Sequence, residues 1–252
     1  MKLRSGNIIV TGGGGGIGKA IAKRMTEDGI QVILCGRSEE KLLQAKEELA
    51  SDKVFTLVWD ISELSVFEEK IRQAEALFGG KVGGFVNAAA VGGEATTGRG
   101  YEPWDITEEE WDLMTDINFK AAYFMMRNEI DYMLANEVRG NILNIASNAA
   151  CMNIIGSYGA AKLSLIKWTR AFGKRYGHNG IIINGIAPGA TFTPMISSYA
   201  HSIDQKYERH AIERFIRPEE IAELAHYLMS DYGEIICGHT VVADGGDNAA
   251  TL

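Results

Sequence analysis

Tyr158 and Lys162 are the residues of this sequence whose types and spacing are best suited to acid–base chemistry. Side chains four residues apart on a helix lie one turn from each other on the same face. An ammonium in that position lowers the pKa of a phenol from about 10 toward the range in which it can accept and return a proton. A Tyr-x-x-x-Lys pair alone is more often part of a solvated helix surface, so its meaning depends on the elements around it.

The segments on either side of this pair have the pattern of strands. Apolar runs at 141–146 and 181–186 predict buried strands, and the residues between them predict a helix over 157–176. Ser147 follows the first of these strands directly. Because the carboxyl ends of parallel strands meet at the edge of the sheet where ligands bind, we expect the Ser147 hydroxyl to lie on the ligand side.

A run of glycines from Gly12 to Gly16, with Gly18 beyond it, separates a predicted strand at 7–11 from a predicted helix at about 17–28. This is the context of a dinucleotide-binding loop, where missing side chains let the backbone approach a pyrophosphate at a helix N-terminus. The run satisfies three fingerprints, G-x-G-x-x-G, T-G-x-x-G-x-x-G and T-G-x-x-x-G-x-G. It therefore predicts a dinucleotide site without identifying its subclass.

The remaining sequence continues the alternation of strand and helix. Further strands are predicted at 31–35, 54–59 and 84–87, and further helices at 38–50, 62–78 and 107–135, the last with a capping box at Thr107 and Glu110. Strands separated by helices predict an α/β fold, a Rossmann-type doubly wound parallel sheet with helices on both faces. We expect a single domain over 1–252, with the irregular stretch 188–217 acting as a lid over the substrate.

Composition narrows the class of protein. Of 252 residues, 46% are hydrophobic and 23% are charged, which is typical of a globular protein and excludes disorder. A net charge of −8 makes nucleic acid and anionic membranes unsuitable partners. We expect a cytoplasmic location, because no apolar run approaches the roughly 18 residues of a membrane span and the first residues lack the apolar core of a signal peptide. The spacing of cysteines and histidines predicts neither a disulfide framework nor a metal site.

Taken in order, these motifs resemble those of the short-chain dehydrogenase/reductase family, along essentially the whole chain. The matching segments are the glycine run, Asp60-Ile61, Val86-Asn87-Ala88-Ala89, Asn118, Ser147, Tyr158 with Lys162, Pro188-Gly189 and a closing strand at 238–246. The length of the chain and the T-G-x-x-x-G-x-G option favour the single-domain oxidoreductase branch of that family.

The resemblance implies a role for each matching residue. Tyr158 would be the general acid/base, Lys162 its partner and a ribose ligand, Ser147 would orient the substrate oxygen, and Asn118 would hold a water that links Lys162 to solvent. Asp60 and Ile61 would contact the adenine, Asn87 the ribose side of the cofactor, and Ile186 and Thr193 the nicotinamide. The full set of implied cofactor contacts is Gly12, Gly14, Gly15, Gly16, Ile17, Gly18, Arg37, Ser38, Asp60, Ile61, Asn87, Ala88, Ala89, Tyr158, Lys162, Pro188, Gly189, Thr191 and Thr193.

Two departures from the family pattern concern the substrate pocket. The usual Asn-Asn-Ala-Gly after the fourth strand is Asn87-Ala88-Ala89-Ala90 here, and the interval from Ser147 to Tyr158 is 11 residues, shorter than is usual. Substrate identity therefore does not carry over from better-known members of the family.

Cofactor choice depends on the end of the second strand. A fold of this kind that binds NAD normally has an acidic residue there, which bonds the ribose 2′-hydroxyl. This sequence has Gly36-Arg37-Ser38 instead, and Arg37 can form charge-assisted bonds to a 2′-phosphate. Ser38 could add a contact or simply cap the following helix. NADP(H) is therefore the favoured cofactor, and NAD(H) remains an alternative.

The functional prediction is an NADP(H)-dependent oxidoreductase that interconverts a small-molecule ketone and a secondary alcohol. Alternatives are an NAD(H)-dependent dehydrogenase of the same family, a non-catalytic NAD(P)-binding regulatory protein, and an epimerase or dehydratase that uses the cofactor transiently. The helices over 107–135 and 157–176 carry more apolar residues than one sheet-facing stripe needs. This excess, with the pairing of these helices in the family, predicts a homotetramer, with a homodimer as the alternative.

Overall fold

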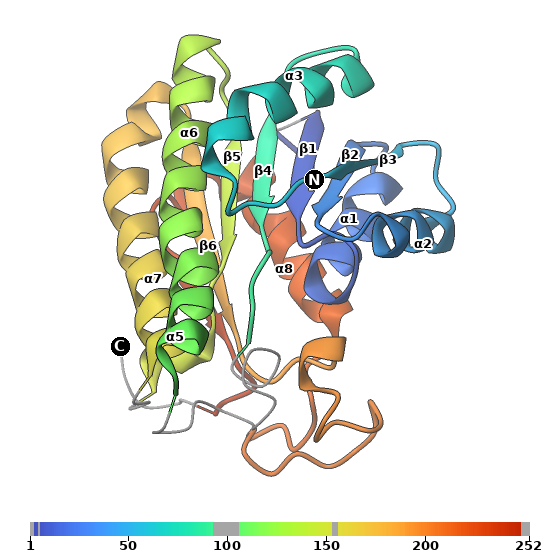
Figure 1. The fold of residues 1–252 in the computed structure, drawn as a ribbon, viewed down its shortest axis with the longest axis vertical. Helices are drawn as coiled ribbons and strands as arrows, with labels where there is room; N and C mark the ends of the chain where they lie inside the picture. Colours follow the sequence, from blue (N-terminus) through green and yellow to red (C-terminus); the bar gives the residue numbers. More distant parts are fainter. Residues whose placement is uncertain (1–2, 5, 93–105, 153–155, 248–252) are drawn as a thin grey trace.

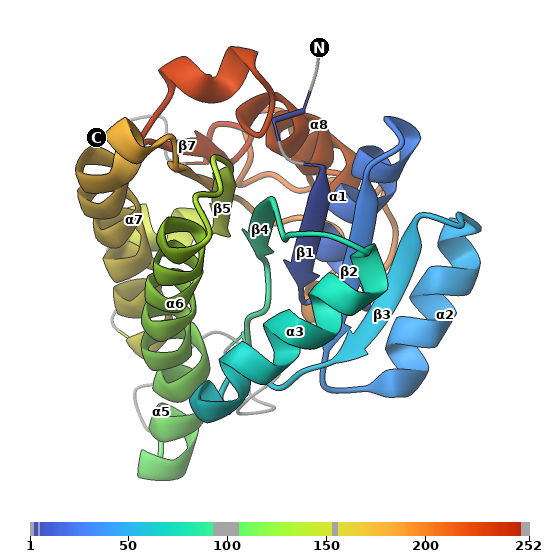
Figure 2. The same cartoon turned by 90° about the horizontal axis from the view of Figure 1, so that it is seen from above.

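The protein is built around one parallel sheet of seven strands, in the order β3-β2-β1-β4-β5-β6-β7 (Figures 1 and 2). The computed structural model describes residues 3–4, 6–92, 106–152 and 156–247. The chain reverses its direction of winding between β1 and β4, and a crevice opens at the carboxyl ends of the strands at such a switch point. The strands are β1 (Asn7–Thr11), β2 (Gln31–Gly36), β3 (Val54–Val58), β4 (Gly84–Asn87), β5 (Asn141–Ile145), β6 (Ile182–Pro188) and β7 (Thr240–Ala243).

Helices cover both faces of the sheet, as the sequence predicts (Figure 2). One face packs against α1 (Gly16–Glu27), α2 (Glu39–Leu49) and α8 (Pro218–Leu228). The other face packs against α3 (Phe67–Phe78), α6 (Ala122–Ala135) and α7 (Ser157–Tyr176). The central strands β5 and β6 are buried along their whole length, as expected for strands between two helical layers. Within the described ranges, no helix has the length and apolar character needed to cross a membrane.

The helix predicted over 107–135 is interrupted in the structure. It consists of α5 (Glu108–Thr115), a π-helical segment (Asp116–Ala121) and α6. Its predicted capping box is present, because Thr107 Oγ accepts from the amide of Glu110 and the Glu110 carboxylate accepts from the amide of Thr107. π-helical turns widen a helix locally and are frequent at functional sites. Hydrophobic spacing does not reveal such a turn, which is why the sequence predicted one continuous helix.

Smaller differences affect the ends of other elements. The helix predicted from residue 62 begins at Phe67, after a 3₁₀ turn at Leu64–Val66. The closing strand is shorter than predicted, because the chain turns at Gly245 and Gly246 with φ of 64° and 86°. Such left-handed backbone favours glycine and ends the strand.

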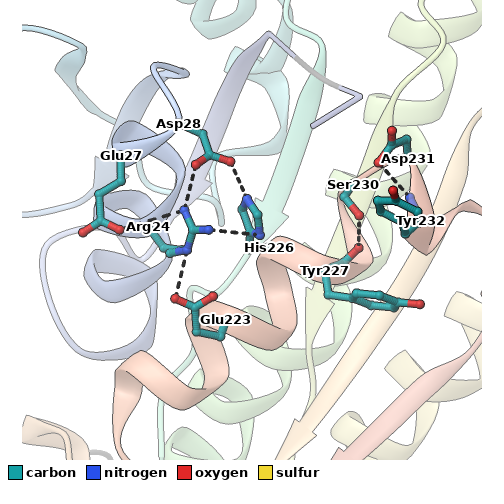
Figure 3. A network of polar contacts seen from close by, with 9 residues as sticks. All are labelled: Arg24, Glu27, Asp28, Glu223, His226, Tyr227, Ser230, Asp231 and Tyr232. Atoms are coloured by element: carbon teal, nitrogen blue, oxygen red, sulfur yellow. Dashed lines mark hydrogen bonds and ion pairs between the residues drawn. The ribbon is translucent and has the colours of Figure 1, made fainter. Parts of the chain in front are cut away.

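Helices α1 and α8 are joined by a network of charged groups (Figure 3). His226 Nε2 lies 2.6 Å from Asp28 Oδ2, and Arg24 contacts both Asp28 at 3.1 Å and Glu223 at 2.9 Å. The hydrogen bond from His226, followed by that from Arg24, holds the pKa of Asp28 below its ordinary value. The network fixes α8 against α1, and the amino ends of both helices border the cavity described below.

The segment 188–217 is irregular, as predicted, but it is tied to its surroundings. His210 is buried; its Nε2 accepts from the amide of Ala190 and its Nδ1 contacts the carbonyl of Arg214. Arg214 in turn makes two hydrogen bonds of 2.7 and 2.8 Å to Glu220 at the start of α8, which lower the pKa of that carboxyl to about 2. The segment is thus anchored at its base.

Candidate active site

A cavity of about 1910 Å³ runs along the carboxyl edge of the sheet. It begins beside Arg37 at the end of β2, passes the glycine-rich loop and the ends of β4 and β5, and continues under the segment 188–217 to Tyr207. Its size exceeds that of an ordinary drug-sized pocket, so it has room for a dinucleotide together with a second small molecule.

The glycine-rich loop is shaped by close backbone contacts. Gly12 has a φ of 67°, and a Cβ there would lie 2.8 Å from the amide nitrogen of Ala89. A Cβ on Gly18 would lie 2.5 Å from the carbonyl oxygen of Gly12. Gly16, where α1 begins, also has a positive φ. The loop therefore uses glycine at 12, 16 and 18, the T-G-x-x-x-G-x-G option.

Gly13 packs against Leu34, where a Cβ would lie 2.9 Å from the Leu34 Cα, whereas the other two glycines of the loop face the cavity. Gly14 and Gly15 line the cavity, and a Cβ on Gly15 would meet no atom within 4 Å. The unbonded amides and positive dipole end of α1 are next to this space, and such a helix end binds phosphate groups. The residues present therefore fit the pyrophosphate of a nicotinamide dinucleotide. The predicted contacts Ile17, Ala88 and Ala89 line the same cavity.

The acid–base pair lies in the wall of this cavity. Tyr158 and Lys162, on the first turns of α7, are 8% and 3% exposed. The Lys162 Nζ donates to the carbonyl oxygen of Ile145 at 3.0 Å and lies 5.7 Å from the centre of the Tyr158 ring. Burial lowers the pKa of Lys162 to about 8. Ser147 lines the cavity at the end of β5, and its Oγ accepts from the amide of Ala149 at 3.2 Å.

Asn118 lies behind this pair and does not line the large cavity. It is in the π-helical segment, and its side-chain amide makes two hydrogen bonds to the backbone of Val91, of 2.8 and 3.2 Å. A second cavity of about 20 Å³ separates Asn118 from Lys162, with Thr11 and Asn87 among its other walls. This volume is enough for one water molecule.

The predicted adenine contacts lie together at the other end of the large cavity. Arg37, Ser38, Asp60 and Ile61 all line it. Two of these side chains also have structural roles, since Ser38 Oγ caps α2 by accepting from a backbone amide and Asp60 Oδ1 accepts from the amide and hydroxyl of Ser62. Lys41 also lines this end of the cavity and was not predicted. Its position four residues after Arg37, at the start of α2, is the feature of the sequence that could have indicated it.

Asn87, a predicted contact on the ribose side of the cofactor, is not among the residues that line the large cavity, and its contact with the cofactor stays a prediction. Its side-chain amide donates to Glu129 and to Asn144, both at 3.0 Å, on the side of the sheet covered by α6. Ile186 is likewise absent from the cavity wall, because it is fully buried in the core. Side chains alternate between the two faces of a strand, so a position at its end does not by itself fix the direction of a side chain.

The predicted contacts from the segment 188–217 are close to the glycine-rich loop. Pro188, Gly189, Thr191 and Thr193 all line the cavity. The methyl group of Thr193 would be 3.2 Å from a Cβ on Gly16, so this side chain packs on the loop. Thr191 Oγ donates to the carbonyl of Gly189, which fixes the turn between them.

Three polar residues of the cavity wall, none of them predicted, contact one another. Asn148 follows Ser147, Arg209 is in the segment 188–217, and Asp247 follows the closing strand. Their side chains meet although they are up to 99 residues apart in the sequence. No sequence pattern links such distant positions, so only the fold brings them together.

The described residues contain no group of three or more His, Cys, Asp or Glu side chains that could hold a metal ion. What the cavity does contain is a dinucleotide-sized space, a phosphate-binding helix end and a Tyr–Lys pair beside a serine. This combination defines an oxidoreductase that uses a nicotinamide dinucleotide.

Comparisons with known proteins give the family. A family model described as enoyl-(acyl carrier protein) reductase matches residues 12–248. Levodione reductase of Leifsonia aquatica is 31% identical and covers 96% of this chain and 94% of that protein. The 2,5-dichloro-2,5-cyclohexadiene-1,4-diol dehydrogenase of Sphingobium indicum is also 31% identical, covering 98% of each.

Solved structures agree with this result. An actinorhodin polyketide ketoreductase with NADPH has a TM-score of 0.85, with 26% identity over 99% of this chain and 100% of that one. A 3-ketoacyl-(acyl-carrier-protein) reductase from Brucella melitensis with NADH has a TM-score of 0.84, with 25% identity over 96% and 97%. The chain belongs to the short-chain dehydrogenase/reductase family and is an NAD(P)-dependent oxidoreductase that acts on alcohol and ketone groups.

Proposed function

We propose that the protein interconverts a cyclic ketone and the corresponding secondary alcohol, with NADP(H) as the preferred cofactor. The observation that supports this proposal best is the buried Tyr158–Lys162 pair beside Ser147 in the wall of a cavity that also fits a dinucleotide. The cyclic substrate is inferred from two relatives, whose names describe a levodione reductase and a cyclohexadiene-diol dehydrogenase.

Each side chain of the site has its own role in the proposed reaction. A bound nicotinamide cofactor supplies or accepts the hydride. Tyr158 gives its hydroxyl proton to the substrate oxygen or takes it back, and a positive Lys162 below the ring stabilises the phenolate. Ser147 has a hydroxyl proton available to the substrate oxygen, since the bond from Ala149 uses Oγ as an acceptor. Asn118 and the small cavity would hold one water that connects Lys162 to a proton path.

Activity is tested with a panel of ketones that includes cyclohexanone, a steroid ketone, a keto sugar and an acyl thioester, each with NADPH and NADH. We expect loss of NADPH absorbance with the cyclic ketone. Tight cofactor binding without turnover on any of them would instead indicate a non-catalytic regulatory protein. Turnover with tightly retained cofactor and no net absorbance change would indicate an epimerase or dehydratase.

Cofactor preference is proposed from the charges at the end of β2. Arg37 lines the cavity there, Lys41 lies one turn further along, and no carboxylate ends the strand. One or two charge-assisted bonds to a 2′-phosphate correspond to a roughly ten- to hundredfold preference for NADP(H).

We expect the double variant Gly36→Asp with Arg37→Ile to reverse the ratio of kcat/KM for NADPH and NADH. Arg72→Ile serves as the control, because Arg72 is an exposed arginine on α3 outside the cavity, and it should leave the ratio unchanged. A wild-type enzyme that prefers NAD(H) would show the cofactor proposal to be wrong.

We further propose that the chain is a single domain in which residues 188–217 act as a lid over a bound substrate. Thr193 and Tyr207, both within this segment, line the cavity that it would cover. A cytoplasmic location is proposed as well, and it is supported by three free thiols, at Cys35, Cys151 and Cys237, since disulfides are rare in that compartment.

A homotetramer, or failing that a homodimer, is proposed from the outer faces of the π-helical segment, α6 and α7. Phe119 and Leu163 are exposed there, and Trp168 makes edge-on ring contacts with Phe119 and Tyr123. Exposed apolar patches of this kind mark interaction sites. Light scattering at micromolar concentration should give four times the 27.5 kDa of one chain, and a monomeric mass would contradict the proposal.

A further inference from the structure

The cavity contains a polar cluster, formed by Asn148, Arg209 and Asp247, that the reaction itself does not use. Asp247 Oδ2 accepts from Asn148 Nδ2 at 3.0 Å and from an Arg209 Nη atom at 3.4 Å. Asp247 is nearly buried, with 10% of its side chain exposed, whereas the Arg209 side chain is 55% exposed. We call these three residues the Asp247 cluster.

The cluster has unused hydrogen-bonding atoms that a ligand can reach. Asp247 Oδ1, Arg209 Nε and Arg209 Nη1 make no hydrogen bond to any residue that the structure describes. Both residues line the cavity. The cluster therefore offers an acceptor for a hydroxyl proton and donors for a carbonyl oxygen, next to each other.

Charge limits what can bind there. The carboxylate of Asp247 and the guanidinium of Arg209 balance each other, so the cluster as a whole is neutral. A charged substrate group would be attracted by one member of the pair and repelled by the other, so the neutral cluster gives it little net attraction. A neutral oxygen, either hydroxyl or ketone, can use both partners without this cost.

The Asp247 cluster lies in the same cavity as the residues proposed to hold the reacting oxygen. Asn148 is the residue after Ser147, so the cluster begins one residue from the hydroxyl proposed to hold the reacting oxygen. Apolar wall lies beside it, because Met152 Sδ is 3.7 Å from Arg209 and the Tyr207 ring is stacked on Phe215 at 4.5 Å. Because Met152, Tyr207 and the cluster line the same cavity as Ser147, the cavity offers apolar surface for a carbon ring together with polar groups for more than one oxygen.

We propose that the substrate carries a second neutral oxygen, a hydroxyl or a ketone, which the Asp247 cluster binds while Ser147 and Tyr158 hold the reacting one. The substrate class is therefore a cyclic diol, hydroxy ketone or diketone. This inference rests on the proposed ketone–alcohol oxidoreduction and adds the specificity of the same site.

The test compares ketones that differ only in the second oxygen. The substrates are 4-hydroxycyclohexanone, cyclohexane-1,4-dione, plain cyclohexanone and 4-oxocyclohexanecarboxylate. A hydrogen bond to a charged side chain corresponds to a roughly ten- to hundredfold gain in kcat/KM for the first two over cyclohexanone. The variants are Asp247→Ala and Arg209→Met, with Glu208→Ala as control, an exposed lid residue paired with Lys206 outside the cavity.

We expect Asp247→Ala to bring the ratio of kcat/KM between 4-hydroxycyclohexanone and cyclohexanone close to one, and Arg209→Met to do the same for the dione ratio. Glu208→Ala should leave both ratios as in the wild type. NADPH affinity and circular dichroism of each variant establish that it is folded.

Three results would overturn the inference. One is a wild-type enzyme that turns over cyclohexanone as well as its oxygenated forms, which would leave the proposed function intact. Another is a wild-type preference that survives Asp247→Ala, since a purely structural role lowers both activities and keeps their ratio. The last is a preference for the carboxylate substrate, which would show that Arg209 binds an anion. A wild-type enzyme inactive on every ketone would instead contradict the proposed function on which this inference rests.

Discussion

Replacing Tyr158 by Phe is expected to lower turnover by several orders of magnitude while leaving cofactor binding nearly unchanged. The substitution keeps the buried ring in the cavity wall and removes only the hydroxyl, the group proposed to transfer the proton. Proton transfer by a positioned side chain contributes about 10²- to 10⁴-fold to a rate. The measurement is kcat with NADPH and the best ketone substrate, together with NADPH affinity from the quenching of protein fluorescence.

Two further variants separate this role from a structural one. Lys162→Ala should lower both turnover and cofactor affinity, because Lys162 is proposed to stabilise the phenolate and to bind the ribose. Tyr176→Phe changes the same residue type at the far end of the same helix and should retain wild-type turnover. If Tyr158→Phe retained about a tenth of the wild-type activity, Tyr158 could not be the main proton donor.

Most of the fold could be predicted from hydrophobic periodicity. The strand β5 and the helix α7 come within one residue of their predicted ends, because a buried apolar run and a long amphipathic segment give strong signals. The π-helical segment at Asp116–Ala121 could not be predicted, since a local widening of a helix leaves its apolar spacing almost unchanged. Within this segment Asn118 donates to the backbone carbonyl of Val91, a tertiary contact that helical periodicity does not reveal.

The site divides in the same way. Gly12 belongs to a glycine-rich loop and Tyr158 and Lys162 to one helical turn, and each of these local patterns is visible in the sequence. All three residues line the large cavity. The direction of the Asn87 side chain depends instead on two partners on other elements, Glu129 and Asn144, so its position at the end of a strand does not reveal it. The Asp247 cluster brings together three segments that are far apart in the sequence, and no local pattern contains that information.

Glu129 is a buried acid whose proton affects the stability of the fold. It is fully buried on α6; its Oε2 accepts from Asn87 at 3.0 Å, and its Oε1 is without a hydrogen-bond partner among the described residues. Burial raises the pKa of Glu129 to about 8, against the smaller opposing effect of the bond from Asn87. At neutral pH the folded protein therefore holds Glu129 as a neutral acid.

This raised pKa predicts the sign of a pH dependence. In the unfolded chain Glu129 loses its proton near its ordinary pKa of 4.5, whereas in the folded chain it keeps the proton up to about pH 8. Between these values the folded state binds more protons, so the free energy of unfolding falls by about 1.4 kcal/mol for each pH unit from this group. Below about pH 4.5 Glu129 causes no loss of stability through this effect, and above about pH 8 the loss has reached its full size.

We therefore expect Glu129→Gln to stabilise the protein at neutral and alkaline pH. A glutamine keeps the size of the side chain and an oxygen to accept from Asn87, but it has no proton to lose. Its advantage over the wild type should be small near about pH 5 and grow to the order of 3–5 kcal/mol at about pH 8. Urea unfolding across this range, at one fixed protein concentration so that any subunit dissociation contributes equally, measures the difference. Asp131→Asn, an exposed acid on the same helix, should follow the wild-type profile, whereas parallel profiles for Glu129→Gln and the wild type would show that Glu129 does not titrate as its burial requires.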